Sequence, residues 1–169
     1  MCLIWHRNCI IERNSGKGRN MINYPLQTNN HRTGINYFQD ISHYRQSDLQ
    51  TWLPILQSLN VSWITLASSV NYAIPEFFLE ALRSKNIEPV VLFNGKSNHY
   101  STLSDLQLLL ESYSKWGVNY LSFFDQPNQR GSWSPSEWAQ ENLVDRFLDL
   151  FTPIAKNAIR LGMFPILLL

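Results

Sequence analysis

Segments with the pattern of a β-strand and segments with the pattern of an amphipathic helix alternate along this chain from Gly34 onward. The strand-like segments are short, nearly continuous apolar runs rich in β-branched and aromatic residues, and the segments between them carry apolar residues at helical spacing. We expect strands near residues 35–39, 62–67, 88–93, 119–124 and 163–169. Parallel strands need long crossover connections, which are usually helices. The alternation therefore predicts an α/β fold with a parallel sheet.

Two architectures contain parallel strands separated by helices. An open doubly wound sheet that binds a nucleotide usually has a glycine-rich turn after its first strand, because the backbone must approach a phosphate closely. The segment after the first expected strand, "YFQDISHYRQ", has no glycine. Polar residues such as Asn36, Asp40 and Asn94 instead follow the strands, and in a (β/α)₈ barrel such strand ends converge on the face that holds the active site. We therefore expect a parallel (β/α) TIM-barrel type fold, incomplete, with about five strands of the usual eight.

Residues 1–33 lack the alternating pattern, and we expect them to form a poorly structured leader before a partial barrel at residues 34–169. Both cysteines, Cys2 and Cys9, lie in this leader, and two cysteines are too few for a disulfide framework. No cluster of histidine, cysteine or carboxylate residues has the spacing of metal ligands, so we expect neither a metal ion nor a cofactor.

The charge balance excludes some classes of partner. The chain has 14 basic and 13 acidic residues, for a formal net charge of +1. Such a chain has no long-range field that attracts a polyanion, so we expect neither nucleic acid nor a membrane as a partner. The apolar run at the start of the chain is broken by His6 and Arg7 and is too short to span a bilayer.

The segment "SPSEW", residues 134–138, combines a capping box with a proline at the first helical position. From this start we expect one long helix that ends at Gly162, with Pro153 kinking the helix or splitting it in two. Outside the fourth strand itself, Glu137 is the carboxylate nearest to the end of that strand. Its part in the capping box is enough to explain it.

The end of the fourth expected strand, "FFDQPN" at residues 123–128, is followed closely by "SPSEW". It resembles the Asn-Glu-Pro segment of the clan A glycoside hydrolases, which are retaining (β/α)₈ barrels. The resemblance covers residues 34–169 and also rests on "GINYFQD" and "IEPVVLFN" as the first and third strands. In that family the asparagine binds the sugar 2-hydroxyl and the glutamate is the general acid/base. The resemblance implies that Asp125 takes the first role and that Gln126 stands at the acid/base position.

Gln126 has no titratable proton, so the resemblance implies a degenerate catalytic site. A retaining mechanism needs two carboxyl groups about 5 to 5.5 Å apart, one of them to protonate the leaving oxygen. An amide can still donate and accept hydrogen bonds, and can therefore hold a sugar hydroxyl without cleaving a bond. We do not expect Asp125 to replace the missing acid, because adjacent residues of a strand point to opposite faces.

The family's nucleophile follows the seventh strand, whereas this sequence ends in what would be the fifth. A partial barrel has two open sheet edges, and we expect a truncated or split reading frame whose missing C-terminal barrel half is a partner. A complete five-stranded open sheet with an apolar edge strand is the alternative.

Amide, carboxylate and indole side chains near the strand ends are the candidate ligand contacts. The candidate substrate-binding residues are Asn36, Asn94, Asp125, Asn128, Trp133 and Trp138. Tryptophan faces commonly stack on sugar rings, but both tryptophans also fit a role in packing. Two aromatic pairs in the loops, His43 with Tyr44 and His99 with Tyr100, are either ligand contacts or surface residues.

These observations favour a carbohydrate-related, glycosidase-like barrel that hydrolyses nothing as this chain, in other words a pseudoenzyme. Two other functions remain open. One is a non-catalytic carbohydrate-binding module that holds a glycan with the strand-end side chains. The other is an open-sheet nucleotide-binding or regulatory domain.

Overall fold

The structure is a computed structural model that describes residues 30–93 and 103–168. Its strands are β1 (Gly34–Asn36), β2 (Trp63–Ser68), β3 (Glu88–Phe93), β4 (Tyr120–Asp125) and β5 (Phe164–Leu168). Its helices are α1 (Gln46–Ser58), α2 (Glu76–Ser84), α3 (Leu103–Lys115), α4 (Pro135–Trp138) and α5 (Leu143–Arg160), with a short 3₁₀ helix at Arg130–Ser132. Most of the expected leader, residues 1–29, lies outside the described residues.

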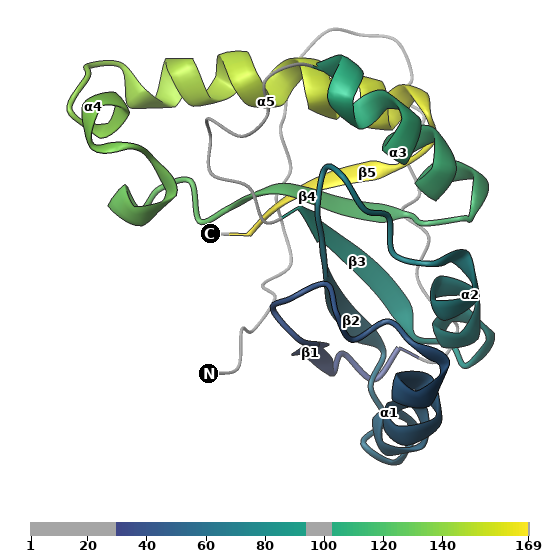
Figure 1. Cartoon of the computed structure of the whole chain (residues 1–169). Coiled ribbons are helices and arrows are strands. Elements are labelled where there is room, and N and C mark those ends of the chain that lie inside the picture. Colours follow the sequence, from purple (N-terminus) through teal and green to yellow (C-terminus); the bar gives the residue numbers. More distant parts are fainter. Residues whose placement is uncertain (1–29, 94–102, 169) are drawn as a thin grey trace, which may run out of the picture.

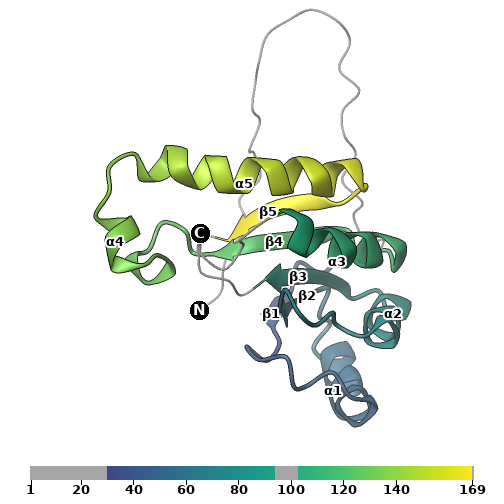
Figure 2. The same ribbon diagram turned by 45° about the horizontal axis from the view of Figure 1, so that its top comes forward.

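The five strands form one sheet in the order β1-β2-β3-β4-β5, and every neighbouring pair is parallel. A doubly wound sheet reverses its strand order at a switch point, whereas a (β/α) barrel adds each new strand beside the last one. The order confirms the predicted class, and the open doubly wound alternative is wrong. Figures 1 and 2 show α1, α2, α3 and α5 arranged around the same side of a curved sheet.

The core lies between this sheet and the helices. Side chains of a strand alternate between its two faces, and one set is fully buried against apolar residues of the helices. The strand residues of this set are Ile64, Leu66, Val91, Phe93, Leu121 and Phe123. The helix residues that meet them include Leu56, Phe78, Leu82, Leu110, Tyr113, Ile154 and Ala158. Burial of this layer is the main stabilising contribution to the fold.

The opposite face of the sheet, here called the inner face, has no described helix over it (Figure 2). A row of aromatic side chains crosses it: the Tyr120 ring lies 5.3 Å from the Trp63 ring and 5.7 Å from the Phe164 ring. Ser122 lies two residues after Tyr120 in β4, and its buried hydroxyl has no hydrogen-bond partner among the described residues.

β4 carries an irregularity close to its end. Ser122 pairs with Ile166 and Asp125 pairs with Leu168, so three steps along β4 match two steps along β5. Two consecutive side chains of β4 are buried in the core: Phe123 stacks on Phe93 at 5.7 Å, and Phe124 meets Phe147 of α5 edge to face at 5.2 Å. Strict alternation of side chains between the two faces therefore fails at Phe123 and Phe124, because a bulge adds one residue to the strand.

The expected long helix after β4 is divided. The capping box is present, with the Glu137 N–H donating to Ser134 Oγ at 3.3 Å and the Ser134 N–H donating to Glu137 Oε2 at 3.0 Å. The helix that it opens, α4, nevertheless ends at Trp138, and Asn142, left-handed with φ 58°, starts α5 as its N-cap. Arg146 then donates to the Glu137 carbonyl at 2.7 Å, which also accepts from the Gln140 N–H at 3.3 Å, so the side chain adds a bond at the end of α4.

Helix α5 runs without a break from Leu143 to Arg160, so Pro153 does not split it. Pro153 is exposed, and water can satisfy the carbonyl that lacks its helical partner. Gly162 follows the helix with φ 82°, a left-handed conformation that suits glycine at a helix end. None of the described helices is both long enough and apolar enough to cross a membrane.

A buried hydroxyl of α3 fixes the loop between β2 and α2. Tyr113 is fully buried, and its hydroxyl accepts a hydrogen bond from the Ile74 N–H at 2.9 Å and shares another with Ser68 Oγ at 2.7 Å. Burial raises the pKa of the Tyr113 phenol, so the group stays neutral. This contact ties α3 to the end of β2 and to the start of α2.

Candidate functional site

The carboxyl ends of parallel strands lie at one edge of a sheet, and in barrel enzymes the functional side chains come from this edge. Three described segments follow strands there. They are the β1–α1 loop (residues 37–45), the β2–α2 loop (residues 69–75) and the β4–α4 loop (residues 126–134). Residues 94–102, which follow β3 and include Asn94, His99 and Tyr100, lie outside the described residues.

The end of β4 places the residues of the degenerate motif. Asp125 is the last residue of β4, and its side chain lies outside the described part of the chain. Gln126 is exposed and left-handed, with φ 47°. Its carbonyl accepts hydrogen bonds from the Gln129 N–H and the Ser132 hydroxyl, both at 2.9 Å. The Gln126 backbone is thus fixed by a tight turn, while its amide faces solvent.

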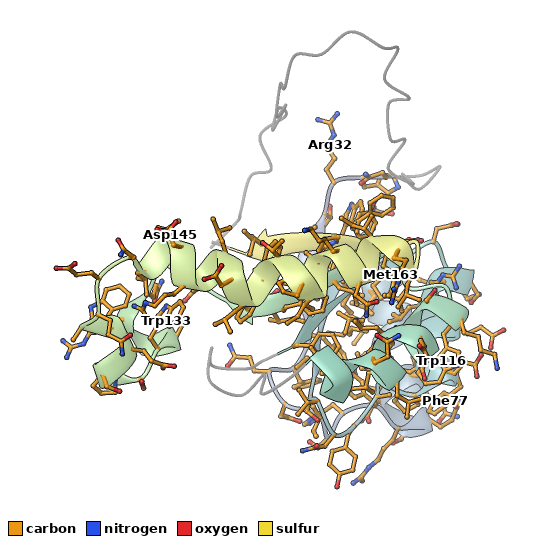
Figure 3. All side chains as sticks on the ribbon, turned by 90° about the horizontal axis from the view of Figure 1, so that it is seen from above. Arg32, Phe77, Trp116, Trp133, Asp145 and Met163 are labelled. Carbon is orange, nitrogen blue, oxygen red and sulfur yellow. The ribbon has the colours of Figure 1, made fainter. Side chains whose placement is uncertain are left out.

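Trp133 is buried rather than open to a ligand. Its indole N–H donates to the Pro127 carbonyl at 2.7 Å, and the Arg146 guanidinium carbon lies 5.7 Å from the ring centroid. Figure 3 shows Trp133 among the side chains near α4 and the start of α5. Trp138 is partly buried in α4, and Asn128 is exposed. Stacking of a sugar on Trp133 would therefore require the β4–α4 loop to move.

Asn36 ends β1 on the inner face. It pairs in register with Thr65, and alternation places both residues opposite the helix-facing Ile35 and Ile64. The Asn36 side chain is exposed. Within the described residues, no side-chain hydrogen bond or ring contact joins Asn36, Gln126, Asn128 and Trp138 to one another. The structure therefore leaves Asn36, Gln126 and Asn128 at one edge of the sheet and Trp138 in α4, without bringing them into a single cluster.

The β1–α1 loop contains a cluster that the sequence reasoning did not assemble. Asp40 Oδ1 accepts hydrogen bonds from the Ser42 N–H at 2.8 Å and from the Ser42 hydroxyl, and it lies 3.0 Å from His43 Nδ1. Ser42 Oγ lies 3.1 Å from the same nitrogen. The Ser42 hydroxyl, followed by its N–H, holds the pKa of Asp40 below its ordinary value. The close spacing of these three residues was the available signal, but only the fold of the loop shows that they meet.

The His43 ring is held on its face as well as at Nδ1. It stacks on Phe38 with a centroid distance of 3.8 Å and an interplanar angle of 15°. Phe38 in turn meets Tyr37 and Trp52 edge to face, at 4.7 and 5.5 Å. The two constraints fix both the position and the rotation of the imidazole.

Tyr44, the neighbour of His43, is not a surface residue. It is buried, and its hydroxyl donates to the Ala67 carbonyl at 2.6 Å. Beside it lies a hollow of about 290 Å³ between the β1–α1 and β2–α2 loops. The residues that line it are Ile41, Ser42, Tyr44, Arg45, Tyr72, Ala73, Ile74 and Pro75. Tyr72 is 68% exposed and presents its ring at the rim.

Metal ligation has no evident place in the described part of the chain, where no three histidine, cysteine, aspartate or glutamate residues gather closely enough to hold an ion. Among the described residues of the candidate site, the Asp40 carboxylate lies 3.0 Å from Nδ1 of His43. Hydrogen bonding is the chemistry that these described side chains offer.

Comparison with known proteins identifies the fold. No family model and no curated protein matches the chain. A solved structure of D-psicose 3-epimerase from Clostridium cellulolyticum H10, determined with D-tagatose, matches with a TM-score of 0.55 and 12% sequence identity. The match covers 79% of this chain and 50% of the epimerase, so this chain spans about half of that protein. A likeness at this identity shows the TIM-barrel fold alone, and it is to an epimerase rather than to a clan A glycoside hydrolase.

Proposed function

We propose that this chain is a carbohydrate-binding protein of TIM-barrel architecture that holds its ligand at the carboxyl ends of its strands and does not hydrolyse glycosidic bonds. The observation that carries this proposal is the edge formed by the ends of β1, β2 and β4. Exposed amides and an exposed aromatic ring lie along it, at Asn36, Tyr72, Gln126 and Asn128. Amides that donate and accept, next to an aromatic face, suit the hydroxyls and the apolar face of a sugar.

The relationship to sugar chemistry is supported at the level of fold by the epimerase, which was solved with a ketose. It is also supported by the resemblance of "FFDQPN" to the clan A glycoside hydrolase segment. Under this proposal Gln126, Asp125 and Asn128 contact ligand hydroxyls from the end of β4, and Asn36 contacts them from β1.

The absence of hydrolysis follows from the chemistry of the residues at the acid/base position. Gln126 cannot donate a proton to a leaving oxygen, and general acid catalysis typically contributes on the order of a hundred to ten thousand-fold. The nearby Glu137 is held by Ser134 in the capping box, and hydrogen bonds from Ser134 keep its pKa below the ordinary value, so it stays ionised. An ionised carboxylate has no proton to give.

The test is calorimetric titration of the full chain with a panel of pentoses, hexoses and short oligosaccharides. Saturable binding of at least one sugar is expected, and Gln126→Ala and Asn128→Ala are each expected to weaken it roughly fivefold, the equivalent of about one hydrogen bond. The matched control is Gln140→Ala, which removes an exposed amide that follows α4 in the sequence. A panel in which no sugar binds would overturn the proposal.

Hydrolysis is tested separately with aryl glycosides. We expect no release of nitrophenol by the full chain, and none by Gln126→Glu, because a retaining mechanism needs two correctly spaced carboxyl groups. Saturable turnover by the unmodified chain would contradict the non-hydrolytic part of the proposal while leaving sugar binding intact.

We also propose that the partner of this chain is a polypeptide that supplies further β/α units to the sheet. The inner face carries the aromatic row of Trp63, Tyr120 and Phe164, and within the described residues no strand pairs with the outer edge of β5. Exposed strand edges readily pair with other chains. Sedimentation velocity at rising concentration is expected to show association of the isolated chain, and a strictly monomeric species at every concentration would contradict this.

A further inference from the structure

The Asp40–Ser42–His43 cluster of the β1–α1 loop has a defined arrangement of protons. A carboxylate accepts hydrogen bonds and donates none, so the His43 Nδ1 that faces Asp40 Oδ1 at 3.0 Å carries a hydrogen. In the neutral imidazole the other nitrogen, Nε2, is then an acceptor with a free lone pair. Nε2 has no hydrogen-bond partner among the described residues.

The direction of this lone pair is fixed by two independent contacts. Asp40 and Ser42 hold Nδ1, and Phe38 holds the ring face at 3.8 Å. Phe38 is itself held, because Tyr37 of the same loop and Trp52 of α1 contact its ring edge to face. A histidine that served only the turn of this loop would need the contact to Asp40 but not the aromatic support.

One residue of the cluster, Ser42, lines the hollow between the first two strand ends, and Asp40 and His43 adjoin that lining along the chain. Ser42 belongs both to the cluster and to the lining of the hollow, and the next lining residues are Tyr44 and Arg45. Tyr72 forms the opposite rim with its exposed ring. The hollow, of about 290 Å³, lies at the lower end of the range for small-molecule sites, roughly 300 to 1,000 Å³.

We propose that this cluster and hollow form a subsite for a single monosaccharide unit, in which His43 Nε2 accepts a hydrogen bond from a sugar hydroxyl and the Tyr72 ring covers the apolar face of the sugar. Arg45 supplies donors to the remaining oxygens. Asp40 is a positioning residue, since it acts through the tautomer and orientation of His43. The subsite deepens the proposed function and rests on it, because it names the place and the size of the sugar that binds.

The experiment observes the imidazole nitrogens of the full, ¹⁵N-labelled chain by NMR during titration with free hexoses and pentoses. The chain has 4 histidines, so His43→Ala and His31→Ala identify two of the signals. Before sugar is added, Nδ1 of His43 is expected in the protonated range and Nε2 in the unprotonated range. With sugar, the Nε2 signal of His43 is expected to move, and that of the exposed His31 is expected to stay.

Variants separate positioning from simple loop structure. His43→Ala and Tyr72→Ala are each expected to weaken sugar binding fivefold to tenfold, and His31→Ala is expected to leave it unchanged. Asp40→Asn is expected to mix the two tautomers of His43 in the ¹⁵N spectrum and to weaken sugar binding. If Asp40 has only a structural role, the same variant would lower the melting temperature without mixing the tautomers.

The outcomes distinguish this subsite from the proposed function as a whole. If a sugar binds and neither the His43 signal nor the affinity of His43→Ala changes, the subsite is wrong and sugar binding at another place stands. If no sugar of the panel binds, both proposals are overturned. If the affinity falls in His43→Ala but the unmodified His43 signal never moves, the effect is indirect and the subsite is also wrong.

Discussion

Replacement of Tyr113 by phenylalanine tests whether the buried hydroxyl of α3 fixes the β2–α2 loop. The phenol oxygen is the acceptor for the Ile74 N–H at 2.9 Å and the partner of Ser68 Oγ at 2.7 Å, and all three residues are buried. Phenylalanine keeps the ring and its contacts with Phe93 and Trp116 but leaves the Ile74 N–H without an acceptor. Ser68 Oγ retains a weaker contact with the Tyr72 carbonyl at 3.5 Å.

The expected loss can be estimated from these two contacts. A net hydrogen bond contributes about 1 kcal/mol, and a buried donor left without a partner costs about 1–3 kcal/mol. The free energy of unfolding should therefore fall by roughly 2–4 kcal/mol in Tyr113→Phe. At about 2–4 °C per kcal/mol for a chain of this size, the melting temperature should fall by roughly 4–16 °C.

Urea unfolding followed by circular dichroism measures this change on the full chain. Tyr72→Phe is the matched control, because Tyr72 is 68% exposed and should change stability by less than about 0.5 kcal/mol. In the double variant Ser68→Ala/Tyr113→Phe, the loss should be smaller than the sum of the two single losses, because the two hydroxyls share one bond. A Tyr113→Phe midpoint equal to that of the unmodified chain, at equal m-value, would contradict a stabilising role for the Tyr113 hydroxyl.

Substitutions at three other positions follow from the same structure. Gln126→Gly should raise the free energy of unfolding slightly or leave it unchanged, and Gln126→Val should lower it by at least about 1 kcal/mol. The reason is that the left-handed backbone at this position favours glycine over β-branched residues. Urea midpoints measure both changes. Phe123→Ala should cost about 3–5 kcal/mol, against less than about 1 kcal/mol for the exposed Phe77→Ala, and equal losses would mean that the core is not where the structure places it. Glu137→Gln should lower the urea midpoint at neutral pH. The difference in midpoint between the variant and the unmodified chain should shrink as the pH falls below 4.5, the ordinary pKa of glutamate, and through the lower pKa of folded Glu137. Protonation of the carboxylate in the unmodified chain removes the stabilising hydrogen bonds from Ser134. A gap that persists in acid would argue against the capping box as its cause.

The alternation of strand and helix patterns was sufficient to predict the parallel sheet and its barrel class, because each strand and each helix is encoded locally. The break between α4 and α5 was not predictable in this way. It depends on the left-handed Asn142 and on Arg146, whose side chain reaches back to the carbonyls of Glu137 and Gln140. A tertiary contact of a long side chain leaves no periodic signal in the sequence.

The candidate site was predicted in part. The positions of Asn36, Gln126 and Asn128 at strand ends follow from the strand pattern, since a parallel sheet brings its carboxyl ends together. The proton arrangement around His43 could not be predicted, because it depends on the turn that brings Asp40 Oδ1 to Nδ1. The burial of Trp133 could not be predicted either. Its indole N–H donates to the backbone carbonyl of Pro127, and any residue at that position would offer such a carbonyl.

The extra residue in β4 divides that strand into two stretches with separate constraints. Up to Ser122 the side chains keep step with β3 and β5, and a substitution that shifted them would disturb three strands at once. Beyond the bulge, Asp125 pairs with Leu168 in a shifted register, and the chain then leaves the sheet in the turn at Gln126. A side chain at the tip of this strand can therefore change without disturbing the pairing of the strands in the barrel wall.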